Sequence, residues 1–294
     1  MRIGRTLGAL VVSLGIVAAG SSVAVAQPAD TADAAPTYYV SLGDSLSQGY
    51  QPLPTPGDTD RGYTDVLYER LAAQEPGLEL VKLGCSGEDT TTMINGGRAN
   101  CSYDTGSQLG DAVAFLNANP GAVTHVTLTI GANDVQRCAR GGIDFACVGQ
   151  GLVTIAQNMP VILGQLRAAG ADVEITGASY YNPFLSFWNG DGLEAKFLTL
   201  GSSALQLVLN GILANAYAQA GAGVADLAGE FASYAYLPFV NDPVYGSVPR
   251  NVSTVCTFTF ICSVNDIHAT DAGYVKIADA YSRAIGVPAA PAAG

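Results

Sequence analysis

A serine lies on a predicted sharp turn directly after a buried strand. The segment Tyr38–Leu42 is typical of a strand, and Gly43-Asp44-Ser45-Leu46 follows it. Glycine permits a tight turn, and an aspartate side chain can hydrogen-bond its own backbone there. A hydroxyl held on such a turn points toward solvent, where it can attack a substrate. Ser45 is therefore a candidate nucleophile, with an ordinary helix-capping serine as the alternative.

The base that such a serine needs is usually a histidine, and the chain has two. His125 alternates with Thr127 and Thr129 along an apolar run, a pattern that predicts a structural position on a strand. His268 lies in a loop just before the last predicted helix, where a mobile base is well placed. If Ser45 is the nucleophile, His268 is the candidate base.

Acyl transfer also needs hydrogen-bond donors for the oxyanion of the tetrahedral intermediate. Gly84 follows the second predicted strand and has an unhindered backbone N–H, and Asn133 follows the third and has a side-chain amide. Each residue alone is also common in ordinary turns. Together with Ser45 they lie at the carboxyl ends of one predicted sheet, which favours a catalytic site.

Strands and helices alternate along the chain. The predicted strands are Tyr38–Leu42, Leu78–Leu83, Val123–Ile130, Val173–Ala178 and Val224–Leu227; the predicted helices are Thr64–Gln74, Gln108–Ala118, Leu152–Ala169, Leu193–Ala220 and Thr270–Ile285. Thr270 is a suitable N-cap for the last helix, and Gly286 a suitable stop. This alternation predicts an α/β fold with a parallel sheet and helices on both faces.

The two ends of the chain are expected to lie outside the folded domain. Residues 1–26 have the pattern of a secretory signal, with arginines, then a short apolar run, then a small-residue cleavage site. Residues 27–36 read as a flexible leader, 37–286 as one domain and 287–294 as a flexible tail. We therefore expect a secreted protein without stable membrane insertion.

The charge balance limits the possible partners. The chain has 13 basic and 25 acidic residues, a net charge of −12, and loss of the signal would remove two arginines and no acid. Such a surface repels nucleic acids and anionic membranes. Neither a phosphate-binding loop nor a dinucleotide fingerprint follows the first strand, which argues against nucleotide binding. We expect a monomer that binds a small-molecule or lipid ester.

Six cysteines should be oxidised after export. Fifteen pairings are possible, and closure of short loops favours the sequential one. The expected pairs are Cys85–Cys101, Cys138–Cys147 and Cys256–Cys262. A zinc site is the alternative, but the cysteines form no CxxC pair and histidine is nearly absent, so we expect no metal.

Two stretches do not fit the alternation. Arg137–Gln150 reads as an insertion, and Glu230–Val264 as a long irregular segment that a disulfide could close. The seven aromatic residues of the second stretch either pack beneath the loop or form an apolar wall for an acyl chain. Tyr180–Phe184, after the fourth strand, is another candidate wall.

The chain resembles the SGNH (GDSL) hydrolase family through four blocks that occur in the family's order. These are Gly43-Asp44-Ser45-Leu46, Gly84, Gly131-x-Asn133-Asp134 and His268. The resemblance covers roughly residues 38–285. It implies that Ser45 is the nucleophile, that the Ser45 and Gly84 N–H groups and the Asn133 amide form the oxyanion hole, and that His268 is the base.

The same resemblance implies a three-layer α/β/α sandwich with a five-stranded parallel sheet in flavodoxin-like order. It implies no metal and no organic cofactor. Secreted actinobacterial lipases and esterases of the family are the most similar members, and they carry three sequential disulfides, which agrees with the pairing that loop closure favours.

The third member of the expected triad departs from the family's pattern. The family usually has aspartate three residues before the histidine, where this chain has Asn265, and Asp266 stands only two before. A backbone carbonyl of Asp266 or Asn265 is therefore expected to orient His268, because a carbonyl can still fix the tautomer of the ring. This dyad predicts that Asn265→Ala and Asp266→Ala each keep most of the activity.

These observations predict a secreted serine ester hydrolase, a lipase or esterase of acyl lipids that forms an acyl-enzyme on Ser45. A phospholipase and an esterase of carbohydrate or plant aromatic esters are the alternatives among enzymes. A secreted binding protein on a hydrolase fold is the alternative outside catalysis, because a fold does not determine a function.

Overall fold

The structure is a computed structural model that describes residues 36–139 and 143–289. The expected signal, nearly all of the expected leader and the end of the expected tail lie outside the described residues.

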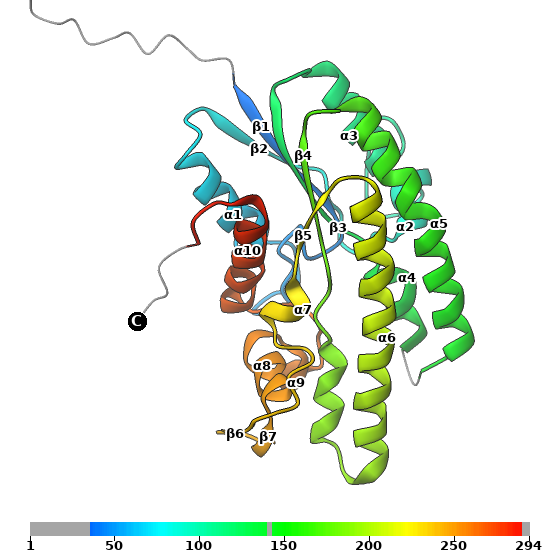
Figure 1. The fold of residues 1–294 in the computed structure, drawn as a ribbon, viewed down its shortest axis with the longest axis vertical. Helices are drawn as coiled ribbons and strands as arrows, with labels where there is room; N and C mark the ends of the chain where they lie inside the picture. Colours follow the sequence, from blue (N-terminus) through cyan, green and yellow to red (C-terminus); the bar gives the residue numbers. More distant parts are fainter. Residues whose placement is uncertain (1–35, 140–142, 290–294) are drawn as a thin grey trace, which may run out of the picture. The chain divides into compact units, whose positions relative to one another are not determined.

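Five parallel strands form the central sheet, in the order β2-β1-β3-β4-β5 (Figure 1). Their bounds are β1 Thr37–Gly43, β2 Leu78–Lys82, β3 Val123–Thr129, β4 Glu174–Ala178 and β5 Gly223–Ala225. All five expected strands are present, and the expected flavodoxin-like order is confirmed. The buried pattern of β1 and β3 reflects their central position, because helices cover both faces of the sheet.

Helices enclose the sheet in two outer layers. On one side lie α1 (Tyr63–Ala72) and α10 (Asp271–Ile285), and on the other α3 (Gln108–Ala118), α5 (Phe145–Ala169) and α6 (Gly192–Gln219) (Figure 1). The shorter elements are α2 Thr90–Asn95, α4 Ala132–Gln136, η1 Arg137–Ala139, η2 Pro183–Asn189, α7 Leu227–Glu230, β6 Phe239–Asp242, β7 Gly246–Pro249, α8 Arg250–Phe258 and α9 Ile261–Val264. The expected three-layer sandwich is confirmed.

Capping residues explain where the long helices begin and end. The Thr270 hydroxyl accepts a hydrogen bond from Gly273 N–H, and Gly286 ends α10 with φ of 87°, as expected. The start of α5 differs from the expectation by seven residues, because Asp144 accepts from the N–H groups of Ala146 and Cys147. Part of the stretch expected to be an insertion is therefore the first turns of α5.

The segment 230–264 is not irregular as expected. It forms the antiparallel ribbon β6–β7 and the helices α8 and α9. The disulfide Cys256–Cys262 joins α8 to α9, and the other two pairs, Cys85–Cys101 and Cys138–Cys147, are also the expected ones. An isolated bridge between Thr259 and Ala269 ties this segment to the loop before α10, which carries His268.

Candidate active site

The backbone at the end of β1 approaches β3 so closely that only glycine fits. Gly43 has φ of 126°, and a Cβ there would lie 2.0 Å from the Thr129 carbonyl oxygen. The N–H of Asp44 donates to the same oxygen at 2.8 Å. These contacts hold the turn that presents Ser45 beyond the carboxyl edge of the sheet.

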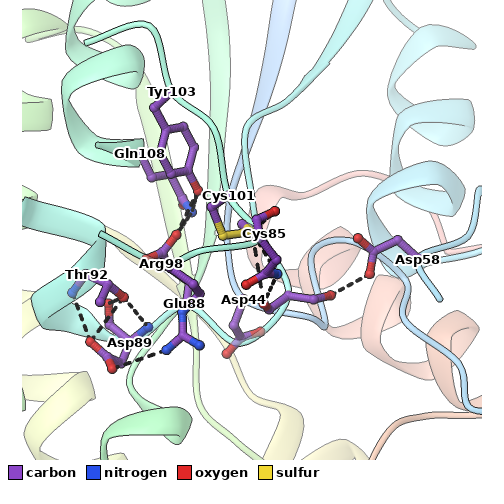
Figure 2. The surroundings of a disulfide bond; sticks show 12 residues. Asp44, Asp58, Cys85, Glu88, Asp89, Thr92, Arg98, Cys101, Tyr103 and Gln108 are labelled. Atoms are coloured by element: carbon purple, nitrogen blue, oxygen red, sulfur yellow. Dashed lines mark hydrogen bonds and ion pairs between the residues drawn. A yellow bond between two sulfur atoms is a disulfide. The ribbon is translucent and has the colours of Figure 1, made fainter. Parts of the chain in front are cut away.

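Gln108, the first residue of α3, clamps the same turn from the other side. Its Oε1 accepts from Gly43 N–H at 2.6 Å, and its Nε2 donates to the Gly43 carbonyl at 3.0 Å. Figure 2 shows the Gln108 side chain beside Tyr103, whose hydroxyl donates to the Glu88 carboxylate at 2.7 Å. The sequence analysis missed Gln108, because no local pattern reveals a contact 65 residues away.

The structure brings Ser45 and His268 together. Ser45 Oγ lies 2.7 Å from His268 Nε2, and His268 Nδ1 lies 2.7 Å from Asp266 Oδ1. A side-chain carboxylate, and not the expected backbone carbonyl, therefore accepts from the imidazole. The three groups form a hydroxyl–imidazole–carboxylate line of the kind that activates a serine.

A tight turn brings Asp266 to the ring from only two residues away. Asp266 Oδ1 also accepts from the His268 backbone N–H at 2.9 Å, so the carboxylate folds back over the loop. Asn265 adopts φ of 56° and its side chain is exposed, so it supplies the turn. Partial burial opposes ionisation of Asp266, but its hydrogen bonds and charge interaction with His268 outweigh that effect and lower the Asp266 pKa.

Neighbouring segments hold the His268 loop in place. Phe260 N–H donates to the His268 carbonyl at 2.9 Å, and the Tyr181 hydroxyl donates to the Ile267 carbonyl at 2.7 Å. The Tyr50 ring packs against the imidazole with 4.5 Å between ring centroids. The α8–α9 segment thus supports the candidate base, although the sequence analysis assigned it no such role.

Asn133 lines the cavity, whereas Gly84 packs against the serine turn. Asn133 lines the same cavity as Ser45 and His268, and its Nδ2 donates to the Glu88 carbonyl at 2.8 Å. A Cβ on Gly84 would lie 2.0 Å from Ser47 Oγ, so the close approach to the serine turn requires a glycine there.

Gly87, three residues after Gly84, lines the same hollow as Asn133. It has φ of 88° and lines a small polar hollow together with Asn133, Arg98 and Arg137. Gly84 lines neither this hollow nor the cavity beside Ser45. In sequence, Gly87 is marked by its place two residues before Asp89, the N-cap of α2.

An apolar cavity begins at Ser45. It encloses about 910 Å³ of empty space, including open solvent at its mouth. Its polar end consists of Ser45, Asn133 and His268. Its apolar lining includes Val135, Ile143, Val148, Leu152, Phe184, Leu205 and Leu209, from α4, α5, η2, α6 and the segment before α5.

The structure also decides between the two candidate walls. Tyr180, Tyr181 and Phe184 line the cavity, as expected for the segment after β4. The aromatic residues of segment 230–264 do not line it. Phe231 is buried and packs on Tyr181 with 4.3 Å between ring centroids, whereas Tyr234 and Phe239 are exposed.

Asp44, next to the nucleophile, is a buried carboxyl group. Burial raises the pKa of Asp44 to about 6, although the Tyr180 hydroxyl at 2.6 Å and the Leu46 N–H at 2.9 Å stabilise the charged form. In the unfolded chain an aspartate titrates near pH 3.9. Between these two pH values Asp44 is therefore protonated in the folded protein and ionised in the unfolded chain. The free energy of unfolding should fall as the pH rises through that window.

Asp44→Asn removes this titration. We expect the free energy of unfolding of the variant, relative to the unmodified protein, to rise by up to about 3 kcal/mol between pH 4 and pH 6 and then to stay level. Urea unfolding at half-unit pH steps measures this difference, because all other groups titrate in both proteins. A difference that does not change with pH would contradict a raised pKa at Asp44.

Other titratable clusters have structural explanations. His125 Nε2 lies 2.7 Å from Glu75 Oε1 near the start of β3, so the expected structural role of His125 is confirmed. Cys85, Cys101 and Glu88 are close enough to one another to hold a metal ion, but the two sulfur atoms are bonded to each other (Figure 2). Their thiolates are therefore not free to act as ligands.

Solved structures share this fold at low sequence identity. An extracellular lipase from Streptomyces rimosus is 20% identical, with a TM-score of 0.54, and the match covers 84% of this chain and 99% of the lipase. A phospholipase A1 from Streptomyces albidoflavus is 18% identical, with a TM-score of 0.52, and the match covers 85% of this chain and all of that one.

An acetyl xylan esterase from Geobacillus stearothermophilus is 15% identical, with a TM-score of 0.50, over 87% of this chain and 97% of the esterase. No curated protein sequence matches the chain significantly. Residues 41–276, however, match the GDSL-like Lipase/Acylhydrolase family as a whole. The match spans most of the chain and includes Ser45, Asn133 and His268, and the protein belongs to the GDSL-like lipase/acylhydrolase family of ester hydrolases.

Proposed function

We propose that this protein is a secreted carboxylic ester hydrolase that cleaves acyl esters through an acyl-enzyme on Ser45. The observation that carries the proposal is the line of Ser45, His268 and Asp266 at the polar end of an apolar cavity. Secretion is supported by three disulfides, which persist mainly in oxidising compartments.

In the proposed reaction His268 moves the protons. Nε2 accepts the Ser45 hydroxyl proton while Oγ attacks the ester carbonyl, and the same nitrogen then protonates the departing alcohol. Water repeats the cycle on the acyl-enzyme and releases the acid. Asp266 holds the ring in the tautomer that leaves Nε2 free to accept, and it stabilises the imidazolium that forms.

The oxyanion needs donors that are present before the reaction begins. We assign this role to the Ser45 N–H and to the Nδ2 hydrogen of Asn133 that is not used by the Glu88 carbonyl. The bond to Glu88 fixes the amide in one orientation. We place the third donor at Gly87 in preference to Gly84, because Gly87 borders a hollow that Asn133 also lines.

Asn133→Ala tests the donor assignment. We expect kcat to fall by about a hundredfold to a thousandfold, the usual effect of removing one such donor, with little change in KM. Steady-state kinetics on a soluble ester measure both constants. Asn158→Ala is a suitable comparison, since Asn158 donates to Thr90 and Thr91 away from the cavity and should change kcat less than threefold.

The cavity favours an acyl chain longer than acetyl. Its lining is mostly aliphatic and aromatic, so each methylene group of an acyl chain that enters it leaves water and stabilises binding by about 0.8 kcal/mol. An acetyl group would leave most of it unfilled. We therefore favour a lipid ester, including a phospholipid, over an acetylated carbohydrate or a small aromatic ester.

A series of p-nitrophenyl esters from acetyl to palmitoyl tests the function and the substrate class together. We expect kcat/KM to rise beyond acetyl and to be greatest for a medium or long chain. A maximum at acetyl would favour a carbohydrate esterase. No hydrolysis of any ester by folded, disulfide-bonded protein would instead favour the binding-protein alternative.

A further inference from the structure

The outer face of α6 is apolar along most of its length. Five large apolar side chains recur there at helical spacing, and each is between 50% and 76% exposed. They are Leu193, Phe197, Leu200, Leu207 and Val208, and we call them the α6 face. A helix on the surface of a globular protein normally turns its apolar stripe toward the core. Helix α6 departs from this rule, because it buries Leu209, Leu213 and Tyr217 and still carries apolar residues on its outer face.

The buried side of the same helix carries polar residues. Ser202 accepts from Asn182 Nδ2 at 2.9 Å, Gln206 Nε2 donates to the Tyr180 carbonyl at 2.8 Å, and the Ser203 hydroxyl lies 2.7 Å from that of Tyr236. Rotation of the helix would leave these buried polar groups unpaired. The bonds therefore hold the apolar residues on the outside.

The two long helices α5 and α6 carry few charges. In α6 the charged residues are Glu194 and Lys196, both in the first two turns, and in α5 the only one is Arg167 near the end. Both helices are long and apolar enough to cross a membrane by composition. Each has a buried side that packs within the domain, so neither is free to span a bilayer. The outer faces of both helices are accessible, but α5 exposes fewer large apolar side chains than α6, namely Phe145, Val153 and Val161.

Further apolar side chains from η2 and the β6–β7 ribbon lie next to the start of α6. Lys196 Nζ lies 4.8 Å from the centroid of the Trp188 ring, and Trp188 meets Phe239 of the β6–β7 ribbon edge to face at 6.1 Å. Phe239 and Leu237 are exposed. Tryptophan at the boundary of an apolar surface is typical of residues at a membrane–water interface.

The α6 face lies on the helix that lines the cavity. Leu205 and Leu209 of α6 line the cavity, and Leu207 and Val208 lie between them in sequence on the outer side. An aggregate of lipid that touched the outer side would be about one helix diameter, roughly 10 Å, from the cavity. An exposed apolar surface that runs along most of a long helix is unusual on a soluble monomeric protein. Such surfaces mark sites of interaction.

We propose that the α6 face docks the protein on the surface of an uncharged or zwitterionic lipid aggregate. Helix α6 then lies in the plane of the interface. The absence of basic residues on the face and the net charge of −12 select against anionic lipid. Docking itself does not depend on ester hydrolysis. Only its purpose rests on the proposed function, since a docked protein would receive lipid esters into the cavity.

Sedimentation with phosphatidylcholine vesicles tests the docking. The protein carries Ser45→Ala, so that no lipid is consumed, and Phe197→Glu and Leu200→Glu are each added. We expect each to weaken partitioning about tenfold or more, because a large apolar side chain no longer leaves water. Val275→Glu, an equal change at an exposed position on α10 behind the sheet, should alter it less than twofold.

Lipid charge and salt provide a second readout. Partitioning should be no stronger on phosphatidylglycerol vesicles and nearly independent of salt between 0.05 and 0.5 M, on the order of a twofold change, since charge does not drive it. No partitioning of the parent protein on phosphatidylcholine would overturn the proposal. So would a dimer that Leu200→Glu dissociates, because a second copy would then cover the face.

The docking and the hydrolysis can fail separately. With Ser45 present, Phe197→Glu and Leu200→Glu should keep kcat/KM on a soluble short-chain ester within about twofold, because neither residue lines the cavity. Vesicle binding without any esterase activity would refute the proposed function alone. Full esterase activity without vesicle binding would refute the docking alone.

Discussion

Ser45→Ala should reduce kcat for ester hydrolysis by about a millionfold, the effect expected when the nucleophile of a serine, histidine and aspartate unit is removed. The reason is that Ser45 Oγ lies 2.7 Å from the only imidazole at the cavity among the described residues. The oxyanion donors and the cavity remain in the variant, so it should still bind the ester. Burst kinetics with a p-nitrophenyl ester should accordingly show no acyl-enzyme phase.

The matched control is Ser47→Ala, two residues along the same turn. Ser47 Oγ donates to the Asp44 carbonyl at 2.7 Å and is fully buried, so this change perturbs the turn without removing the nucleophile. We expect it to cost stability and to keep activity within about tenfold. Equal losses in the two variants would mean that the turn, and not the Ser45 hydroxyl, limits the reaction.

Asp266→Ala should reduce kcat by about a thousandfold to ten thousandfold while KM changes little. Without the carboxylate, Nδ1 loses its acceptor at 2.7 Å, and neither the tautomer nor the imidazolium of His268 is stabilised. This reverses the result expected from sequence, where a backbone carbonyl was assigned to the ring and the Asp266 side chain was dispensable.

Asn265→Gly is the matched control for Asp266→Ala. It removes the neighbouring side chain, and glycine tolerates the φ of 56° without the strain that alanine would add. Activity within about threefold of the unmodified protein is expected. Because Asp266 acts through His268, Asp266→Ala should also change the pH profile of kcat/KM, which a purely structural loss would not do. If Asp266→Ala kept most of the activity and the pH profile of kcat/KM were unchanged, the result would support the dyad with a backbone carbonyl.

Much of the fold was predictable because its signals are local. Strand positions follow from short apolar runs, α10 begins at Thr270 because a hydroxyl caps it, and it ends at Gly286 because glycine adopts a left-handed conformation readily. The three disulfides close short loops, so nearest-neighbour pairing was enough to predict them.

The errors concern contacts between distant segments. The α8–α9 segment looked irregular, because α8 and α9 are only nine and four residues long and no capping side chain marks the start of either. Gly84 and Gly87 are equivalent in sequence as candidate donors, and only the packing of Gly84 on Ser47 and the shared hollow of Gly87 and Asn133 distinguish them.

The layered α/β fold, the serine turn after β1 and the histidine loop before α10 were all predictable from local sequence patterns. Turns, caps and apolar periods depend on neighbouring residues. Only the tertiary structure decided which group orients His268, which glycine borders Asn133, which helices line the cavity and which way α6 faces. Those outcomes depend on hydrogen bonds and packing between segments far apart in the chain, such as Asn182 with Ser202 and Gln108 with Gly43, and no local pattern encodes them.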